Sequence, residues 1–439
     1  MNTLLNEILN AREARAFRQQ ALLRRFQRPV VCFTMNIAGP VKTSPLIRRA
    51  FDAGLSALES ALPASAVRSR EVIHAITGDE AIFCVDMDAS VLKGICTAIE
   101  EASPMGRLFD MDVLDTSGQK LERGQQRSCL VCGAPGRGCA ARRAHSVDAL
   151  QSATTALIQA HFAGGDQTRI ASAAVGALLE EVHTTPKPGL VDRRSNGSHR
   201  DMDIPLFAAS AQALRPYFAC CAAIGQETVM LSSAQAFPPL REAGLAAEKA
   251  MYAATGGVNT HKGAIYTLGI LCAAFGRLWH TGETMPTAET VLALCAAIAG
   301  DAAKADLEDA KADTAGLRLY RELGISGIRG EMAQGLPAVK NTALPVFRAA
   351  LHRGMNRNDA GAVTLLHLIA AVQDTNLYHR GGQAGAEFAA QAARELLAQS
   401  PYPALAQIEA LDDAFIARNL SPGGCADLLA ATYLLEALL

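Results

Sequence analysis

Apolar residues recur at helical spacing through most of the chain after residue 166, as on one face of an α-helix. These segments are rich in Ala and Leu, which favour helices, and polar loops with Gly, Pro or Asn separate them. The pattern predicts helices over residues 170–182, 263–279, 287–299, 359–374 and 425–438. We therefore expect this part of the chain to form an all-α helical domain.

Residues before about 165 show short apolar runs that are typical of strands. The pattern predicts strands over 29–35 and 107–114, a hairpin of 71–77 and 81–86 around a Gly78-Asp79 turn, and a helix over 90–102 capped by Ser90. This mixture indicates an α+β domain with a mixed sheet. Because 439 residues exceed what one compact core usually holds, we expect two domains, 1–163 and 164–439, with their boundary near residues 161–168.

Composition narrows the class of protein. Half of the residues are hydrophobic and the formal net charge is −2, whereas proteins that bind nucleic acids are usually visibly basic. The polar N-terminus lacks the apolar core of a signal peptide, and the most apolar run, 263–279, is too short to span a bilayer comfortably. We therefore expect a cytoplasmic protein with neither a nucleic-acid nor a membrane partner, whose eleven cysteines are thiols.

Two aspartates stand out in the predicted strand 107–114. Residues two apart in a strand point to the same face, so Asp110 and Asp112 share one face while Phe109, Met111 and Val113 pack on the other. Adjacent carboxylates repel unless a cation neutralises them, and Mg²⁺ binds one or two carboxylates together with substrate phosphates. The pair therefore predicts a Mg²⁺ site for phosphoryl transfer, although a solvated strand face, as at Asp86 and Asp88, fits the pattern too.

Two further segments of the first half carry candidate chemistry. The loop 38–44 follows a predicted strand, and its Gly and Lys42 suit contact with a phosphate, although an ordinary turn is the alternative. Further along, three thiols and an imidazole have the ligand types of a zinc site. The C-x2-C spacing fits zinc but the C-x6-C gap is unusual, so ordinary thiols remain the favoured interpretation of Cys129, Cys132, Cys139 and His145.

Segments 29–34, 39–42, 106–113 and 129–145 resemble the apo-citrate lyase phosphoribosyl-dephospho-CoA transferases. The resemblance covers about residues 15–150. It implies a nucleotidyltransferase, the holo-citrate lyase synthase, that transfers phosphoribosyl-dephospho-CoA to a serine of the apo acyl carrier subunit of citrate lyase and releases diphosphate. On this resemblance Asp110 and Asp112 hold Mg²⁺, and Arg107 or Lys42 faces the triphosphate.

Four polar clusters lie between the helices predicted in the second half. The first, residues 181–203, is a loop stiffened by prolines that includes His183, Lys187, Asp192 and Arg193. The second, 256–263, places a Gly pair, Asn259, His261 and Lys262 at the start of the most apolar helix, a natural phosphate site. The others, 358–379 and 421–428, contain Asp374 with Asn376, and Asp427. Helix caps or buried core positions are the alternatives for His367 and for Asp427.

Segments 185–192, 256–263, 327–331, 373–376 and 421–429 look very like triphosphoribosyl-dephospho-CoA synthase. This family joins ATP to 3′-dephospho-CoA through attack of its 2′-hydroxyl on C1′ of the ATP ribose, which expels adenine. The reaction needs a carboxylate to activate the hydroxyl, and cations with Mg²⁺ to hold the triphosphate. The candidates for charge are Lys187, His261, Lys262 and Arg329, and the candidate carboxylates are Asp192, Asp374 and Asp427.

Together the two resemblances imply a bifunctional enzyme that makes and installs the citrate lyase prosthetic group. Two alternatives remain. The same chemistry serves malonate decarboxylase in a related branch, and one half of the chain could act only as a carrier-docking or nucleotide-binding module. The intact Asp110 and Asp112 argue against lost chemistry in the first half.

Overall fold

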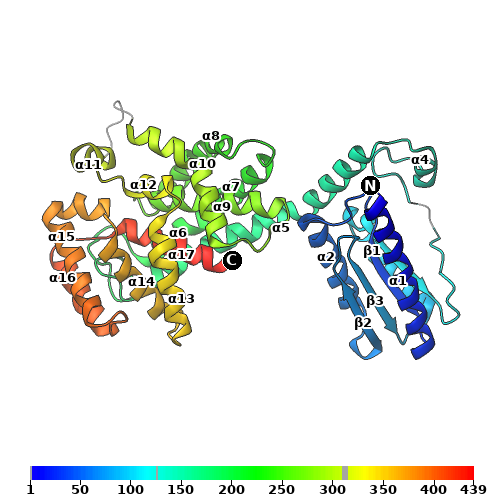
Figure 1. The fold of residues 1–439 in the computed structure, drawn as a ribbon. Coiled ribbons are helices and arrows are strands. Elements are labelled where there is room, and N and C mark those ends of the chain that lie inside the picture. Colours follow the sequence, from blue (N-terminus) through cyan, green and yellow to red (C-terminus); the bar gives the residue numbers. More distant parts are fainter. Residues whose placement is uncertain (1, 125–126, 309–314) are drawn as a thin grey trace. The chain divides into compact units, whose positions relative to one another are not determined.

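The computed structural model describes residues 2–124, 127–308 and 315–439, and it divides into two compact units (Figure 1). Unit 1 contains Met1–Gly164 together with His280–Glu283. Unit 2 contains Gly165–Trp279 and Thr284–Leu439. Each unit has a hydrophobic core of its own.

Unit 1 is built on a four-stranded sheet with strand order β2-β3-β1-β4. Its strands are β1 (Val30–Met35), β2 (Val67–Ile73), β3 (Glu80–Val85) and β4 (Phe109–Leu114). The predicted strands and hairpin are confirmed, but the predicted mixed sheet is wrong, because every neighbouring pair runs antiparallel. Helices connect β1 to β2 and β3 to β4, but neither connection joins neighbouring strands, so no parallel pair forms.

Helices cover both faces of this sheet. Apolar side chains of α2 (Pro45–Ala61) and α3 (Ala89–Glu101) pack on one face, around Phe33, Phe83 and Met111. On the other face, Leu23 of α1 (Asn2–Phe26) packs against Cys32 and Ile82 (Figure 1). The remaining elements of unit 1 are η1 (Ala64–Ala66), η2 (Pro104–Leu108) and α4 (Gly136–Arg142).

The start of α3 differs from the prediction. Asp88, and not Ser90, caps this helix, because the Asp88 carboxylate accepts hydrogen bonds from the N–H groups of Ser90 (2.8 Å) and Val91 (3.2 Å). Asp86 is held by Arg28 and Arg68, at 2.5 Å from each. The second D-x-D pattern is therefore accounted for by a helix cap and surface ion pairs.

The described residues of unit 2 form helices joined by loops, with no strand, as predicted. The helix α5 begins in unit 1 and ends in unit 2. The helices are α5 (Val147–His183), α6 (Ile204–Ala213), α7 (Arg215–Glu227), η3 (Ser233–Ala236), α8 (Phe237–Ala254), α9 (Lys262–His280), α10 (Ala288–Glu308), α11 (Ala315–Leu323), α12 (Gly327–Ala333), η4 (Val339–Ala343), α13 (Leu344–His352), α14 (Arg357–Ala371), α15 (Thr375–Gln399), α16 (Leu405–Ala417) and α17 (Gly423–Leu438).

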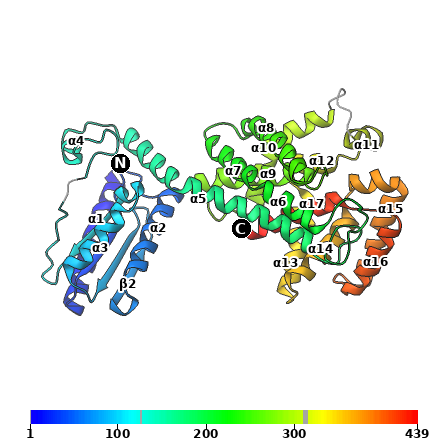
Figure 2. The same cartoon turned by 180° about the vertical axis from the view of Figure 1, so that it is seen from behind.

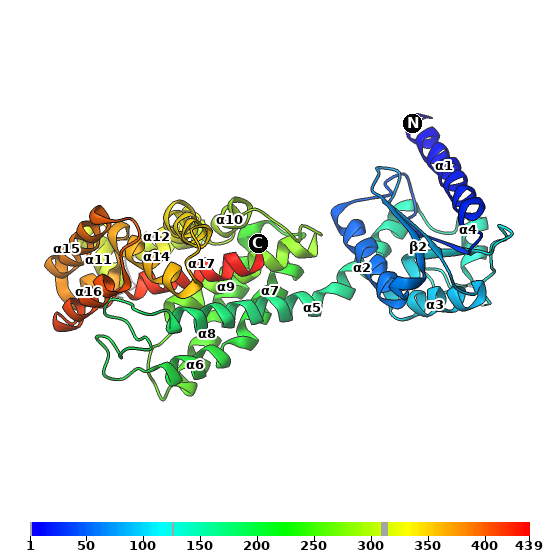
Figure 3. The ribbon, with the colours of Figure 1, turned by 90° about the horizontal axis from the view of Figure 1, so that it is seen from below.

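The core of unit 2 surrounds α9, whose residues are buried on most sides. A helix that is apolar all round is expected in such a position. Around it, α14 packs against α13, α15 and α17 (Figures 2 and 3). Among the described residues, no helix is both long and apolar enough to cross a membrane.

One predicted helix of unit 2 ends three residues earlier than expected. The expected helix over 359–374 ends at Ala371, and Asp374 instead caps the next helix, α15. His367 and Asp374 therefore do not share the face of one helix. Nε2 of His367 donates to the carbonyl of Pro401 at 2.9 Å.

Candidate active site

Strand β4 presents the two predicted carboxylates of unit 1 on one face of the sheet. Phe109, Met111 and Val113 are buried in the core, while Asp110 and Asp112 alternate with them and remain partly accessible. Asp112 pairs with Lys120 at 2.6 Å. Burial raises the pKa of Asp110 above its usual value, and the negative charge of Asp112 raises it further. The ionised carboxylate of Asp110 is therefore stabilised when a cation binds beside it.

The same face carries a third carboxylate that sequence reasoning missed. Thr34 of β1 lies opposite Asp110 on one side and opposite Glu80 of β3 on the other, so all three residues share a row across the sheet. Glu80 is buried and pairs with Arg15 at 2.6 Å and with Arg18 at 2.5 Å. Because these arginines belong to α1, which the sequence pattern did not reveal, the cluster could not be foreseen.

The two cations predicted near this site are engaged by the chain itself. Lys42 donates to the carbonyl of Ile37 at 2.5 Å, and burial lowers its pKa. Arg107 donates to the carbonyl and hydroxyl oxygens of Ser128. Both residues flank the edge where the end of β1 meets the start of β4, at the pair Met35 and Phe109.

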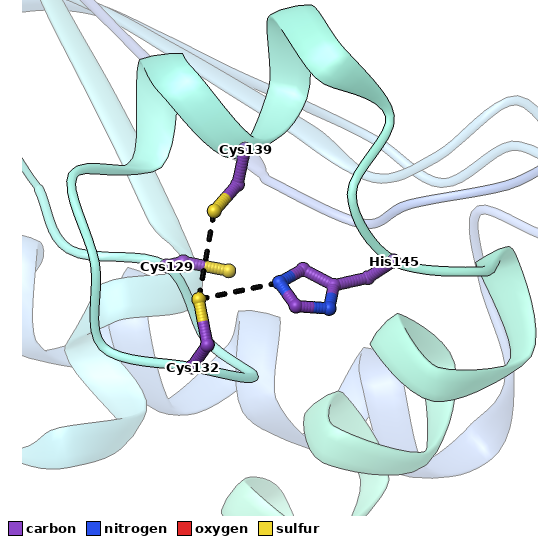
Figure 4. A group of neighbouring side chains, drawn as sticks. All are labelled: Cys129, Cys132, Cys139 and His145. Carbon is purple, nitrogen blue, oxygen red and sulfur yellow. Dashed lines mark hydrogen bonds between the residues drawn. The ribbon is translucent and has the colours of Figure 1, made fainter.

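The four candidate zinc ligands lie together in unit 1 (Figure 4). Their ligand atoms all lie within 4.8 Å of one another in the group Cys129, Cys132, Cys139 and His145. Hydrogen bonds from the backbone N–H groups of Cys132 and Val131 lower the pKa of the Cys129 thiol to about 6. The C-x6-C gap, which argued against zinc in the sequence, is closed by a turn and a short helix.

Unit 2 contains a cavity of about 970 Å³. It brings together eight of the residues predicted from the sequence clusters of the second half. These residues come from the loop after α5, the start of α9, the helix α12 and the starts of α15 and α17. They are Lys187, Asn259, His261, Lys262, Arg329, Asp374, Asn376 and Asp427.

Six carboxylates line this cavity, and three of them, Asp374, Glu181 and Asp427, have clearly different environments. Asp374 is buried, and its two oxygens accept from the N–H groups of Asn376 (2.7 Å) and Cys425 (2.8 Å). Glu181, which sequence reasoning did not select, pairs with the buried ammonium of Lys187 at 2.5 Å. Asp427 is the least engaged, and burial raises its pKa well above the usual range, with further increases from the charges of Glu181 and Asp374.

Close backbone approach explains a glycine beside Asp427. A Cβ atom at Gly263, in the first turn of α9, would lie 1.9 Å from Oδ2 of Asp427. No side chain tolerates that distance, so glycine lets the carboxylate reach the N-terminal end of α9. Partial positive charge at such a helix end favours a carboxylate or a phosphate there.

The buried His261 presents an unused ring nitrogen. Thr260 donates to Ser210 at 2.7 Å, and the Ser210 hydroxyl lies 2.7 Å from Nδ1 of His261. In this series of hydrogen bonds the Ser210 hydroxyl donates its proton to Nδ1. The ring hydrogen of His261 therefore lies on Nε2, which is a donor. Nε2 is buried and has no hydrogen-bond partner among the described residues. Burial lowers the pKa of His261 to about 3, and the charge of Lys187 contributes, so the ring is neutral at pH 7.

A cluster of opposite charges forms another part of the cavity lining. Arg241 pairs with Asp306 at 2.7 Å, and Arg329 lies 3.8 Å from the same carboxylate. Lys262 pairs with Glu248 at 2.9 Å. Sequence reasoning missed Arg241 and Asp306, because they are ordinary surface-like charges on α8 and α10 and no motif marks them.

Three residues that the sequence placed in the site do not line the cavity described here. Asp192 is buried, but its carboxylate accepts from the N–H groups of Lys187 (2.9 Å), Arg194 (2.7 Å) and Ser195 (3.0 Å) and so holds the loop in shape. Arg193 is exposed and donates to Asn358 at 2.6 Å. His183 is exposed too, with Nδ1 2.6 Å from the carbonyl of Leu179.

Two protein families match the chain, one over each of its two parts. Residues 167–439 match the ATP:dephospho-CoA triphosphoribosyl transferase family. Residues 3–161 match the family of apo-citrate lyase phosphoribosyl-dephospho-CoA transferases.

Curated relatives match over the whole chain or over its second part. Protein CitXG of Haemophilus influenzae is 38% identical over 98% of this chain and 95% of its own length. Protein CitXG of Leuconostoc mesenteroides is 33% identical over 99% of this chain and 97% of its own length. The 2-(5″-triphosphoribosyl)-3′-dephosphocoenzyme-A synthase of Pectobacterium atrosepticum is 46% identical over 59% of this chain and 85% of its own length. The chain therefore belongs to the ATP:dephospho-CoA triphosphoribosyl transferase family, joined to an apo-citrate lyase phosphoribosyl-dephospho-CoA transferase segment, and is a transferase of citrate lyase prosthetic-group biosynthesis.

Proposed function

We propose that the chain catalyses two consecutive reactions. Unit 2 joins ATP to 3′-dephospho-CoA and releases adenine, which gives 2′-(5″-triphosphoribosyl)-3′-dephospho-CoA. Unit 1 then transfers phosphoribosyl-dephospho-CoA to a serine of the apo acyl carrier subunit of citrate lyase and releases diphosphate. The family matches of the two segments support these two activities.

The observation that carries the proposal is the composition of the cavity in unit 2. Its volume of about 970 Å³ is at the upper end of the range usual for small-molecule sites. Cationic side chains line it, as a triphosphate requires, and the carboxylate of Asp427 lies beside the start of α9. The cations are Lys187, Arg241, Lys262, Arg329 and Arg380.

Within this cavity we assign the general base to Asp427. The oxygens of Asp374 are taken by two backbone N–H groups, and Glu181 is paired with Lys187. Asp427 has a raised pKa and lies at the helix start, so it is suited to take the proton from the 2′-hydroxyl as the new C1′–O bond forms. As the C1′–N bond to adenine breaks, the Nε2–H of His261 donates a hydrogen bond to the departing base, and the proton that Asp427 takes from the 2′-hydroxyl balances the one that free adenine gains.

In unit 1 the residues present fit a Mg²⁺ ion. Asp110 and Asp112 offer hard oxygen donors on one face of β4, and no hydrogen bond reaches the Asp110 carboxylate from any described residue. Such an ion supplies charge stabilisation to the phosphate oxygens at the transferred phosphorus. Asp110 and Asp112 would hold it, while Lys120 beside Asp112 adds a second positive charge.

Mass spectrometry of the products tests both reactions. Purified protein with ATP, dephospho-CoA and magnesium should release adenine, and addition of apo-carrier should produce a covalent mass gain on the carrier. The Asp427→Asn variant should lose the first product. The Asp110→Asn and Asp112→Asn double variant should release adenine normally and lose only the mass gain.

The same assay separates the alternatives. If the double variant modifies carrier at the wild-type rate, unit 1 acts as a docking module and the assignment of Asp110 and Asp112 is wrong. Offering the apo-carriers of citrate lyase and malonate decarboxylase together decides the target. A preference for the malonate decarboxylase carrier would contradict the citrate lyase assignment.

A further inference from the structure

The segment from Arg127 to His145 has too little apolar packing to hold its own shape. Most of its described side chains are exposed or half-buried, and its contribution to the core of unit 1 comes mainly from the half-buried Leu130. Short segments of this kind usually need a disulfide or a metal ion to fix their shape. The chain nevertheless gathers three thiols and an imidazole at one point in it (Figure 4).

The local backbone builds this gathering. Cys129 and Cys132 lie on a tight turn closed by hydrogen bonds from Cys129 N–H to the Ala134 carbonyl (2.6 Å) and from Gly133 N–H to the Cys129 carbonyl (3.0 Å). Gly133 adopts φ +72°, a conformation that glycine tolerates best. Helix α4 then carries Cys139 back to the turn, and the chain after α4 returns His145 to the open side.

The distances match a tetrahedral metal site. Arms of about 2.3 Å to sulfur and about 2.0 Å to nitrogen place neighbouring ligand atoms of a tetrahedron roughly 3.5–3.8 Å apart. The Sγ atoms of Cys132 and Cys139 lie 3.5 Å apart, and Nε2 of His145 lies 3.3 Å from Sγ of Cys132. A disulfide requires about 2.05 Å between sulfurs, so these thiols are not bonded to each other.

We propose that Cys129, Cys132, Cys139 and His145 bind one Zn²⁺ ion as a structural site. Three soft sulfur donors and one imidazole nitrogen, with ligand atoms that all lie within 4.8 Å of one another, suit zinc. Four protein ligands leave no open position for substrate or water, so the ion has a structural role and no role in the chemistry.

The site explains how this segment stays attached to the candidate active site of unit 1. Arg127, just before the first ligand, donates to the Phe109 carbonyl at 2.7 Å and pairs with Glu100 at 2.8 Å. Ser128 accepts from Arg107. The zinc site therefore anchors both arginines against the start of β4, the strand that carries Asp110.

Metal analysis of the full-length protein tests the proposal. Plasma mass spectrometry should find one zinc per chain after purification without added metal, and a mercurial reagent should release it to a colorimetric indicator as the cluster thiols react. Protein that is fully folded by circular dichroism yet contains no zinc, and takes up none when zinc is supplied after reduction, would overturn the proposal. Iron in place of zinc would overturn it as well.

Variants locate the ion. Cys132→Ser should lower the zinc content at least tenfold, whereas Cys220→Ser, at an exposed cysteine of unit 2, should leave it unchanged. If Cys132→Ser is insoluble, His145→Cys keeps four zinc-binding ligands and should retain the metal, while His145→Ala should weaken its retention against a chelator. Equal retention in both His145 variants would contradict the assigned ligand set.

Discussion

The buried ion pair between Lys187 and Glu181 gives the sharpest test of the site in unit 2. The Lys187 ammonium lies 2.5 Å from the Glu181 carboxylate, with side-chain exposures of 2% and 7%. Replacing Lys187 with Met keeps most of the apolar stem but leaves Glu181 buried without its counter-ion. Removing one partner of a buried pair costs about 3–5 kcal/mol, because the remaining charge is not solvated.

That loss of free energy should be visible as a lower unfolding temperature. At about 2–4 °C per kcal/mol for a domain of this size, Lys187→Met should lower the unfolding midpoint of unit 2 by roughly 10 °C. The control is Lys340→Met, because Lys340 pairs with Glu289 at 2.7 Å on the surface, with exposures of 45% and 75%. A surface pair of that kind contributes about 0–1 kcal/mol, so this variant should unfold close to the wild type.

A double variant separates stability from function. Adding Glu181→Gln to Lys187→Met removes the uncompensated charge and should recover part of the lost stability. Adenine release, measured well below the unfolding midpoint, should stay low in the double variant because the cation that we propose for the triphosphate is still missing. An unchanged midpoint in Lys187→Met, or wild-type adenine release in the stable double variant, would refute this account of the pair.

Three further results are expected in unit 2. Gly263→Ala should reduce adenine release at least tenfold, because its Cβ would lie 1.9 Å from the Asp427 carboxylate, whereas Gly176→Ala in α5, with open space around it, should not. The rate of adenine release should rise with pH above the range in which an ordinary aspartate ionises, because the raised pKa of Asp427 keeps the base protonated at lower pH; Asp427→Asn should lower the rate about 10²–10⁴-fold and abolish that rise. Burial lowers the pKa of His261 to about 3, so below pH 6.5 the unfolded chain binds a proton that the folded chain does not, and the free energy of unfolding should fall as pH drops. In urea titrations at pH 4.5, His261→Gln should reduce that loss by about 3 kcal/mol. Equal losses in both proteins would contradict the assignment.

Local pattern was enough to predict the carboxylate pair of unit 1. Alternation in β4 puts Phe109, Met111 and Val113 in the core and Asp110 and Asp112 outside it, and that geometry depends only on the strand itself. The direction of neighbouring strands was not predictable in this way. It depends on which strands pair, and the helical connections that suggested a mixed sheet join strands that are not neighbours.

In unit 2 the sequence motifs marked the cavity but not the role of each residue. Asp192 and Glu181 show the difficulty, since each is an acid beside the same loop. The Asp192 carboxylate accepts hydrogen bonds from three backbone N–H groups of that loop, while Glu181 lines the cavity near the end of α5. The partners of a buried carboxylate are set by the folded loop, so residue type and spacing alone do not tell which of the two acids reaches the cavity.

The two units hold their carboxylates by different physical means, and this predicts how each site responds to change. Asp374 caps α15 and also accepts from the first turn of α17, so one side chain ties together two helix starts that are far apart in sequence. A Cβ at Gly424 would lie 3.1 Å from Oδ2 of Asp374, close enough that α17 or the carboxylate must shift. Small displacements of packed helices therefore move the carboxylates of unit 2 together. In unit 1, by contrast, Asp110 and Asp112 follow a single strand, and their spacing is preserved as long as β4 stays paired with β1.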